Sequence, residues 1–348
     1  MQTLLIPILL QIIIILAISR LFAALFKKIG QPRVVGEMLA GLFLGKSIFG
    51  LFFPESYNYI FPPESFKYLH ILSQIGLIIF MFTIGLEVDL GLIRNKAKQA
   101  IAVSHVGIIV PFILGVLAAY LFYDDFRTPQ SDFVSFALFV GIVMSITAFP
   151  VLIRILQEYN MTKTALGTMA ITCAAVDDIT IWLVLAVFIG VSKNSNILHI
   201  LMIATFLLGI AFSRTEFFKT KFIEKIGSVS SKIFLPLFFT FSGLRTDISS
   251  VQSATLWSIC IIIILFAVFG KLLGVAIMAK LTGSNWKDAF ALGALMNARG
   301  LMSLIVLNIG YDVQILSKEI FTILIIMSFV TTMMAGPLLK ITLKRVLS

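Results

Sequence analysis

The stretch TALGTMAITCAAVDDITIWLVLAVFIGV, residues 164 to 191, is long and apolar enough to cross a membrane, yet it carries two adjacent carboxylates. A helix of this length spans a bilayer. Asp177 and Asp178 are then expected near the midplane, where an ionised Asp costs at least about 2.5 kcal/mol. A buried ion pair that only joins helices is one explanation. We favour a site that a cation and protons occupy in turn, because acids inside a membrane usually mark ion or proton paths.

The composition excludes a soluble globular domain. Apolar residues make up 59% of the 348 residues, charged residues only 13%, and the mean hydropathy is +1.05. Soluble domains contain about a quarter charged residues, so we predict an all-α polytopic membrane protein. Cys173 and Cys260 both lie in apolar stretches, which indicates neither a disulfide nor a metal site.

Apolar runs of about twenty residues predict about eleven membrane-spanning helices. They are expected near residues 4–26, 34–51, 68–86, 97–122, 133–157, 164–191, 197–213, 229–244, 255–281, 287–309 and 319–339. Connections on one side carry eighteen Lys and Arg residues, whereas those on the other side carry six. This asymmetry explains the net charge of +10 without nucleic acid, and it places the N-terminus outside and the C-terminus in the cytoplasm.

Two pairs of segments indicate an internal repeat. They are FMFTIGLEVDL (80–90) with FFTFSGLRTDI (238–248), and GEMLAGLFLGKS (36–47) with TFLLGIAFSRT (205–215). The members of a pair lie on helices of opposite direction, so we expect two inverted repeats, 1–191 and 197–348, and no soluble regulatory domain. In transporters built from such repeats, the substrate binds at the midplane between them.

The fifth and tenth predicted helices should be equivalent in this repeat, and each is expected to be broken at its centre. Pro150 lacks a backbone donor and disfavours helix at Phe149. In the tenth helix, the tetrapeptide from Asn297 to Gly300 places polar groups and Arg299 at mid-depth. Crossed breaks would present opposing helix ends that can line a cation site. An ordinary kink at Pro150 is the alternative.

Lys271 is predicted to lie about 15 Å from the end of its helix. This is too far for its stem to reach the interface, so the ammonium needs a carboxylate, and Asp177 and Asp178 are the acids at its depth. The pair is either a structural bridge or a counter-ion that a cation displaces. Arg299 cannot lose its proton, and we interpret it as a fixed charge with either a structural or a functional role.

Cation and proton binding is predicted at Asp178, Asp177 and Thr147. The hydroxyl of Thr147 and the carbonyls freed near Phe149 would complete an oxygen shell for a hard monovalent cation. Protons would compete for the same carboxylate oxygens, so that one occupant excludes the other.

These segments resemble the monovalent cation:proton antiporter superfamily, in the branch of bacterial Kef-type and plant CHX-type exchangers. The resemblance rests on QPRVVGEMLAGLFLG, FTIGLEVDL, SITAFPVLIRIL, AAVDDITIWLVLA, LPLFFTFSGLRTDI, GKLLG and NARGLMSLIVLNIG, in family order along nearly the whole chain. It implies an inverted-repeat antiporter fold in which a core domain moves against a dimerisation domain, which allows a homodimer. It also implies that Asp178 is the main carrier of cation and proton, that Asp177 is the partner of Lys271, and that exchange is electrogenic.

The chain departs from this pattern in two places. Relatives usually have about thirteen helices, and residues 192–200 leave no room for two of them, which removes part of the usual dimer-forming scaffold. Ser303 stands where many relatives carry Glu.

We therefore expect an antiporter, not an enzyme, that exchanges Na⁺ or K⁺ for protons in a bacterial cytoplasmic membrane without a cofactor. A Kef-like cation channel and a shortened paralogue that no longer transports are the alternatives.

Overall fold

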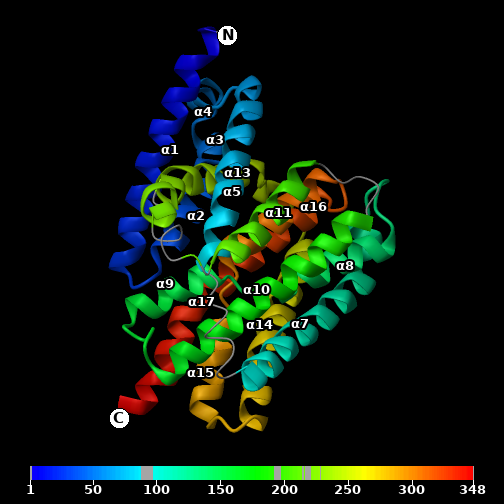
Figure 1. Ribbon diagram of the computed structural model, residues 1–348. Helices are drawn as coiled ribbons and strands as arrows, with labels where there is room; N and C mark the ends of the chain where they lie inside the picture. The colour runs from blue at the N-terminus through cyan, green and yellow to red at the C-terminus, as the bar shows by residue number, and fades with distance from the viewer. Residues whose placement is uncertain are drawn as a thin grey trace. The chain divides into compact units, whose positions relative to one another are not determined.

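The computed structural model describes residues 2–87, 97–191, 197–213, 215, 221–227 and 229–347. Every regular element in these ranges is helical, as the sequence predicts (Figure 1). Nine helical stretches among them are long and apolar enough to cross a membrane. Shorter apolar helices at Ile200–Phe212 and Met302–Asp312 match the seventh predicted crossing and half of the tenth. The connections predicted around Arg94, Lys96, Arg214 and Lys219 lie outside the described residues.

The chain divides into two compact units, each made from two separate stretches of sequence. The first unit comprises Met1–Asp89 and Ile189–Ser249, and the second comprises Leu90–Phe188 and Ser250–Ser348. Both therefore draw on each of the two repeats that the sequence predicts, so the repeats and the compact units are different divisions of the chain.

The first unit holds the helices that carry the predicted repeat segments. They are α1 (Gln2–Lys28), α2 (Arg33–Leu44), α3 (Phe49–Phe52), α4 (Pro54–Ile60), α5 (Phe66–Glu87), α11 (Ile197–Phe212) and α13 (Leu235–Arg245), with the short 3-10 helix η1 (Pro63–Ser65) and the short π-helices η2 (Ile223–Gly227) and η3 (Ser230–Phe234). The helix predicted over 34–51 ends at Leu44, where Gly45 turns the chain before α3 begins. The predicted connection after it contains α4, which the sequence pattern did not indicate.

Two close helix crossings in the first unit join the predicted repeat segments. A Cβ atom on Gly243 of α13 would lie 2.1 Å from the backbone carbon of Gly41 in α2. A Cβ atom on Gly209 of α11 would lie 2.8 Å from the Cα atom of Gly85 in α5. In the predicted alignment Gly41 corresponds to Gly209, and Gly85 to Gly243. The two crossings therefore pair corresponding positions of the predicted alignment.

Gly243→Ala is expected to lower the unfolding free energy by about 1–3 kcal/mol, because the added methyl group meets backbone that can move only if α2 and α13 separate. Thermal unfolding in detergent measures the effect. Gly50→Ala is the matched control, since its Cβ atom would meet only side chains, at 3.3 Å from Tyr57. An unchanged unfolding temperature for Gly243→Ala would contradict the tight crossing.

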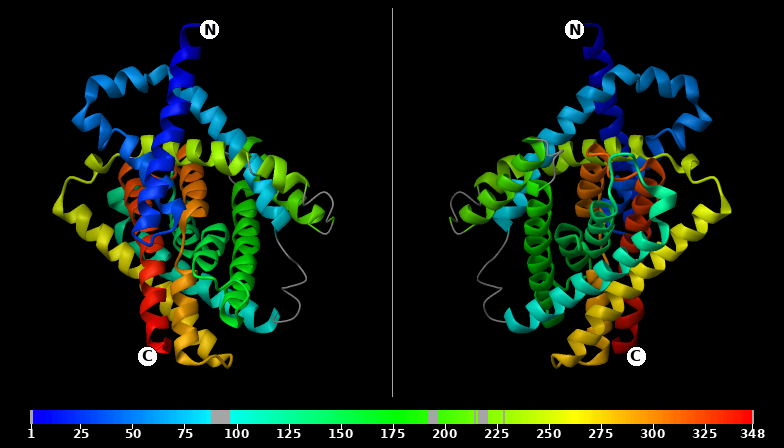
Figure 2. Two further views of the ribbon diagram at one scale, coloured as in Figure 1. Left: turned by 90° about the vertical axis from the view of Figure 1, so that its left-hand side faces the viewer. Right: turned by 90° about the vertical axis from the view of Figure 1, so that its right-hand side faces the viewer.

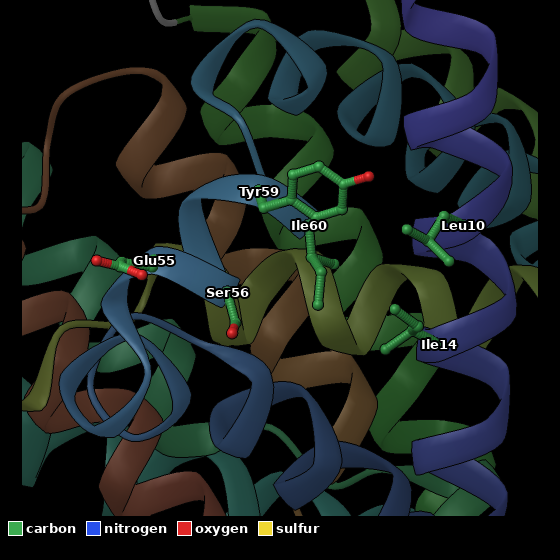
Figure 3. A pocket seen from close by; sticks show the side chains of 6 residues that line it. All are labelled: Leu10, Ile14, Glu55, Ser56, Tyr59 and Ile60. Atoms are coloured by element: carbon green, nitrogen blue, oxygen red, sulfur yellow. The ribbon is translucent and has the colours of Figure 1, made fainter.

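One pocket of about 410 Å³ opens in the first unit between α1 and α4 (Figure 3). Leu10 and Ile14 line it from α1, whereas Tyr59 and Ile60 line it from α4. Glu55 and Ser56 supply its polar groups. The carboxylates and the lysine predicted to form the ion site lie in the other unit.

The second unit holds the long helices that carry those charged residues. They are α7 (Ala97–Phe126), α8 (Phe133–Ser145), α9 (Phe149–Glu158), α10 (Ala165–Val191), α14 (Ala254–Leu281), α15 (Trp286–Met296), α16 (Gly300–Asp312) and α17 (Lys318–Leu347), of which the last residues of α10 belong to the first unit. Here α7 packs against both α8 and α14, and α17 packs against α14, α15 and α16 (Figure 1).

Three helices of this unit begin at a residue whose side-chain oxygen accepts a hydrogen bond from a backbone amide of the first turn. Asp132 accepts from the Ser135 amide at 2.8 Å, Ser253 from the Leu256 amide at 3.1 Å, and Asn285 from the Asp288 amide at 2.8 Å. The hydrogen bonds from the backbone and hydroxyl of Ser135 hold the pKa of Asp132 below its ordinary value.

Candidate functional site

Two broken helices meet in the second unit. Helix α8 ends at Ser145 and α9 begins at Phe149, while α15 ends at Met296 and α16 begins at Gly300, so a short link separates the helices of each pair. The link between α15 and α16 is the thin orange stretch in Figure 2. The Ala148 amide donates to the Ala298 carbonyl at 2.7 Å, which joins one link to the other. Both helices predicted to be broken are therefore interrupted, and their breaks lie side by side.

The first break lies a few residues before its predicted position. Phe149 and Pro150 occupy the first two positions of α9 rather than the link, which comprises residues 146–148. Proline is well tolerated there because the amides of a first helical turn have no partner within the helix. In the second break, Asn297 follows the last residue of α15, and Gly300 opens α16.

The carbonyl end of α8 is held by two cationic side chains. The Arg299 guanidinium donates through Nη1 to the carbonyls of Val143, at 3.1 Å, and Met144, and through Nη2 to that of Ala267, at 3.0 Å. Lys271 Nζ donates to the Ser145 carbonyl at 2.8 Å. Positive charge at a helix C-terminus is favourable. The carbonyls near Phe149 that we expected to be free for a transported ion are therefore hydrogen-bonded to the side chains of Lys271 and Arg299.

The amide ends of α9 and α16 also have specific partners. The Phe149 amide donates to the carboxylate of Asp178. The amides of Arg299 and Gly300 lie 3.3 and 2.9 Å from the Thr332 hydroxyl oxygen of α17. Gly300 has φ +48°, a left-handed conformation, and a Cβ atom there would lie 2.6 Å from Val151 Cγ2, so glycine is required.

Asp177 of α10 is the centre of the hydrogen-bonded cluster. Its Oδ2 atom accepts from Lys271 Nζ at 2.8 Å and lies 2.6 Å from the Thr147 hydroxyl. Its Oδ1 atom accepts from the Ser104 hydroxyl of α7. Asp177 and Lys271 are both fully buried. Thr147 also lies 3.0 Å from the Met296 carbonyl, so its single proton has two acceptors and serves one at a time.

Asp178 differs from its neighbour although both are buried. It is 3% exposed, and its Oδ2 atom has no hydrogen-bond partner among the described residues. Neither side-chain polar atom of the buried Asn297 has a partner within the same described ranges. Thr147, predicted to complete the oxygen shell of the cation, has its hydroxyl 2.6 Å from Asp177 Oδ2.

The two carboxylates can therefore do different things. The oxygens of Asp177 are engaged by protein donors, whereas Asp178 keeps an oxygen that can accept a proton or coordinate a cation. A buried acceptor without a partner costs about 1–3 kcal/mol, and more when it is charged, so a ligand at that oxygen is favoured. Lys271 places a compensating positive charge on the adjacent acid.

The sequence pattern missed Ser104 and Thr332. Both stand in apolar helices without a neighbouring charge or break, so hydropathy and motif spacing do not single them out. The one available signal for Ser104 is Gly107 three residues later on the same helix face. A Cβ atom on Gly107 would lie 3.8 Å from Lys271 Nζ. The face of α7 that carries Ser104 and Gly107 therefore lies against both Asp177 and Lys271.

Comparison with known proteins gives a consistent result along the chain. A family model described as the transmembrane region of sodium/hydrogen exchangers matches residues 13–203 and 201–345. The Na(+)/H(+) antiporter NhaS4 of Synechocystis is 36% identical over 95% of this chain and 96% of its own length. The Cation/H(+) antiporter 17 of Arabidopsis thaliana is 31% identical over 94% of this chain, which spans only 47% of that protein.

The sodium proton antiporter MjNhaP1 from Methanocaldococcus jannaschii shares the fold, with a TM-score of 0.63 at 13% identity over 97% of this chain and 96% of that one.

The alignment with the Synechocystis protein runs over 392 positions, more than the 348 residues here, so that relative has residues that this chain lacks. The two matches to the family model meet at residues 201–203. This junction follows α10, where the sequence predicts two fewer helices than in relatives.

Proposed function

Because this chain belongs to the sodium/hydrogen exchanger family, we propose that it is a transporter that exchanges a monovalent cation for protons across a membrane. The observation that carries the proposal is the buried Asp178 carboxylate, whose Oδ2 atom has no partner in the described part of the chain. It lies beside an acid whose oxygens already have protein donors. A carboxylate of this kind suits a ligand that must bind and leave.

In this mechanism a proton and a cation occupy Asp178 in turn. The two occupants exclude each other because each neutralises the same negative charge, and a buried site does not tolerate an uncompensated one. The site opens to one side of the membrane at a time, and only the occupied states cross. Inward movement of one ion then drives outward movement of the other.

Lys271 acts as a displaceable counter-ion in the same mechanism. Its 2.8 Å contact with Asp177 compensates one of the two adjacent acids while the cation site is empty. A cation at Asp178 adds positive charge next to this pair and weakens the hold on Lys271. Arg299 is the fixed charge, since three backbone carbonyls hold its guanidinium.

The transported cation is Na⁺ or K⁺. Oxygen atoms of a carboxylate and of carbonyl groups serve both ions. The names of the two relatives differ on this point, since one specifies sodium and the other only a cation.

Reconstitution into proteoliposomes tests the function. A proton gradient imposed across the vesicle wall should drive Na⁺ or K⁺ uphill, and an imposed cation gradient should drive protons uphill. Cation flow that only runs down its gradient would identify a channel instead. No flow above that of empty vesicles would identify a paralogue that does not transport.

We also propose that the protein lies in a bacterial cytoplasmic membrane with its N-terminus outside and its C-terminus in the cytoplasm. The charge difference between the two sets of connections supports this orientation. Fusion of a fluorescent protein that folds only in the cytoplasm to the C-terminus should give fluorescent cells. A periplasmic phosphatase fused there should be inactive, and the reverse pattern would contradict the orientation.

A homodimer is part of the same proposal, since the family resemblance implies a dimerisation domain. Native mass spectrometry of the detergent-solubilised protein should detect it. Because the sequence predicts two helices fewer than in relatives, we expect the dimer to dissociate when lipid is removed, and a dimer that persists without lipid would contradict this.

A further inference from the structure

Ser104 contacts the candidate site from a helix that carries no charge at that depth. It is fully buried in α7, and its hydroxyl donates to Asp177 Oδ1. One turn earlier on the same helix, the Ala100 carbonyl lies 3.7 Å from Cys173 Sγ, one turn before Asp177 on α10. Two contacts with the same four-residue spacing fix the register of α7 against α10.

The donors to Asp177 are divided between its two oxygens. Oδ2 faces Lys271 and Thr147, so it keeps a donor even when one of them moves away. Oδ1 has Ser104 as its donor in the described part of the chain. Ser104 is therefore the donor whose removal leaves Asp177 Oδ1 without a hydrogen bond in the described part of the chain.

We propose that Ser104 is a positioning residue that withholds Asp177 from the transported cation. This inference rests on the proposed function and assigns to α7 a role in setting how tightly the site holds its cation. With Oδ1 bound to Ser104 and Oδ2 to Lys271 and Thr147, the cation has one carboxylate, that of Asp178. A site with one carboxylate binds a monovalent cation weakly enough to release it on each cycle.

Removal of the Ser104 hydroxyl frees Oδ1 inside the protein. A buried carboxylate oxygen without a donor is a strong ligand, because no solvent competes for it. The cation would then bind between Asp177 and Asp178 and would be held more tightly. A hydrogen bond to a charged group contributes enough to change an affinity by about tenfold.

Ser104→Ala therefore has an expected signature that simple damage to the fold does not produce. In proteoliposomes with an imposed proton gradient, we expect the KM for the cation to fall about tenfold. The maximal exchange rate should fall with it, because release becomes slow. Ser104→Thr keeps the hydroxyl and should restore the parental KM, and Ser104→Cys, with its weaker donor, should give an intermediate value.

Ser73→Ala is the matched control. Ser73 is also fully buried, and its hydroxyl donates to a backbone carbonyl, that of His70, at 2.7 Å. This variant should keep the parental KM. An unchanged or raised KM in Ser104→Ala, with parental exchange intact, would overturn the role of Ser104.

Cation binding measured without transport separates this inference from the proposed function. The unfolding temperature of the detergent-solubilised protein, titrated with NaCl or KCl against choline chloride, gives the concentration for half-maximal stabilisation. That concentration should be about tenfold lower in Ser104→Ala than in the parent. A parent that binds cations but does not exchange them would refute the proposed function alone, whereas equal midpoints in parent and variant would refute the inference alone. If Ser104→Ala does not fold, Ser104→Cys gives the same comparison.

Discussion

Asp178→Asn is expected to abolish exchange of cation for protons while the protein still inserts and folds. The amide cannot take up a proton in competition with a cation, and it cannot neutralise a cation's charge. It can still accept the hydrogen bond from the Phe149 amide at the start of α9, because the side-chain carbonyl is retained. Loss of exchange should therefore come without a large loss of stability.

Gradient-driven exchange in proteoliposomes measures the effect, with thermal unfolding in detergent as the check on folding. Asp125→Asn makes the same substitution at an exposed position near the end of α7 and should leave exchange unchanged. Exchange at the parental rate in Asp178→Asn would show that the carrier is another group.

Lys271→Ala is expected to have the largest effect on stability. It removes the ammonium from a fully buried ion pair and leaves both Asp177 and the Ser145 carbonyl without that donor. Breaking a buried pair by removing one partner typically costs about 3–5 kcal/mol.

The same variant should also respond less to bound cation, since there is no lysine left to displace. If exchange survives, we expect it to move less charge per cycle, which currents on solid-supported membranes measure. Lys280→Ala is the control on the same helix, because the Lys280 ammonium lies 5.9 Å from the ring of Trp286 and touches no buried acid in the described ranges. Parental stability and parental currents in Lys271→Ala would identify Lys271 as a structural cation.

The presence of a break in each of the two helices was accessible from sequence because proline, glycine and charged residues interrupt an apolar pattern, although the first break lies a few residues before Phe149 and Pro150. That Lys271 pairs with one of the two adjacent acids was also accessible, since a lysine so far from the interface needs a carboxylate at its own depth. The family resemblance implied Asp177, which is the partner in the structure. In both cases an unpaired polar or charged group inside the protein has a free-energy cost, and only a few partners can remove it. The compensating partner is then nearly determined.

The donors around these charges were less accessible. The Thr332 hydroxyl accepts hydrogen bonds from the backbone amides at the start of α16, and the Ser104 hydroxyl donates one to Asp177. Both hydroxyls nevertheless lie in helices whose apolar sequence pattern is undisturbed. Hydroxyls are tolerated on any buried helix face because they can bond a carbonyl of their own helix, as Thr331 does. Their contacts depend on how helices pack in three dimensions, which a linear pattern does not specify.

The backbone carbonyls at the C-terminal end of α8 are a second case in which the sequence did not predict the hydrogen-bond partners. Helix breaking predicts that Val143, Met144 and Ser145 lose their partners within the helix, but it does not say what replaces them. In the structure Arg299 and Lys271 supply the donors, so the carbonyls compensate protein charges. The oxygen available to a ligand is therefore on Asp178.

Proton release on cation binding tests most directly whether a cation and a proton share Asp178. NaCl or KCl is added to the purified protein in weakly buffered detergent at a series of pH values, and the released protons are measured with a pH-sensitive dye. The parent should release protons as cation binds, Asp125→Asn should behave as the parent, and Asp178→Asn should release none. Cation binding by the parent without proton release at any pH, or equal release by Asp178→Asn, would contradict competition at this carboxylate.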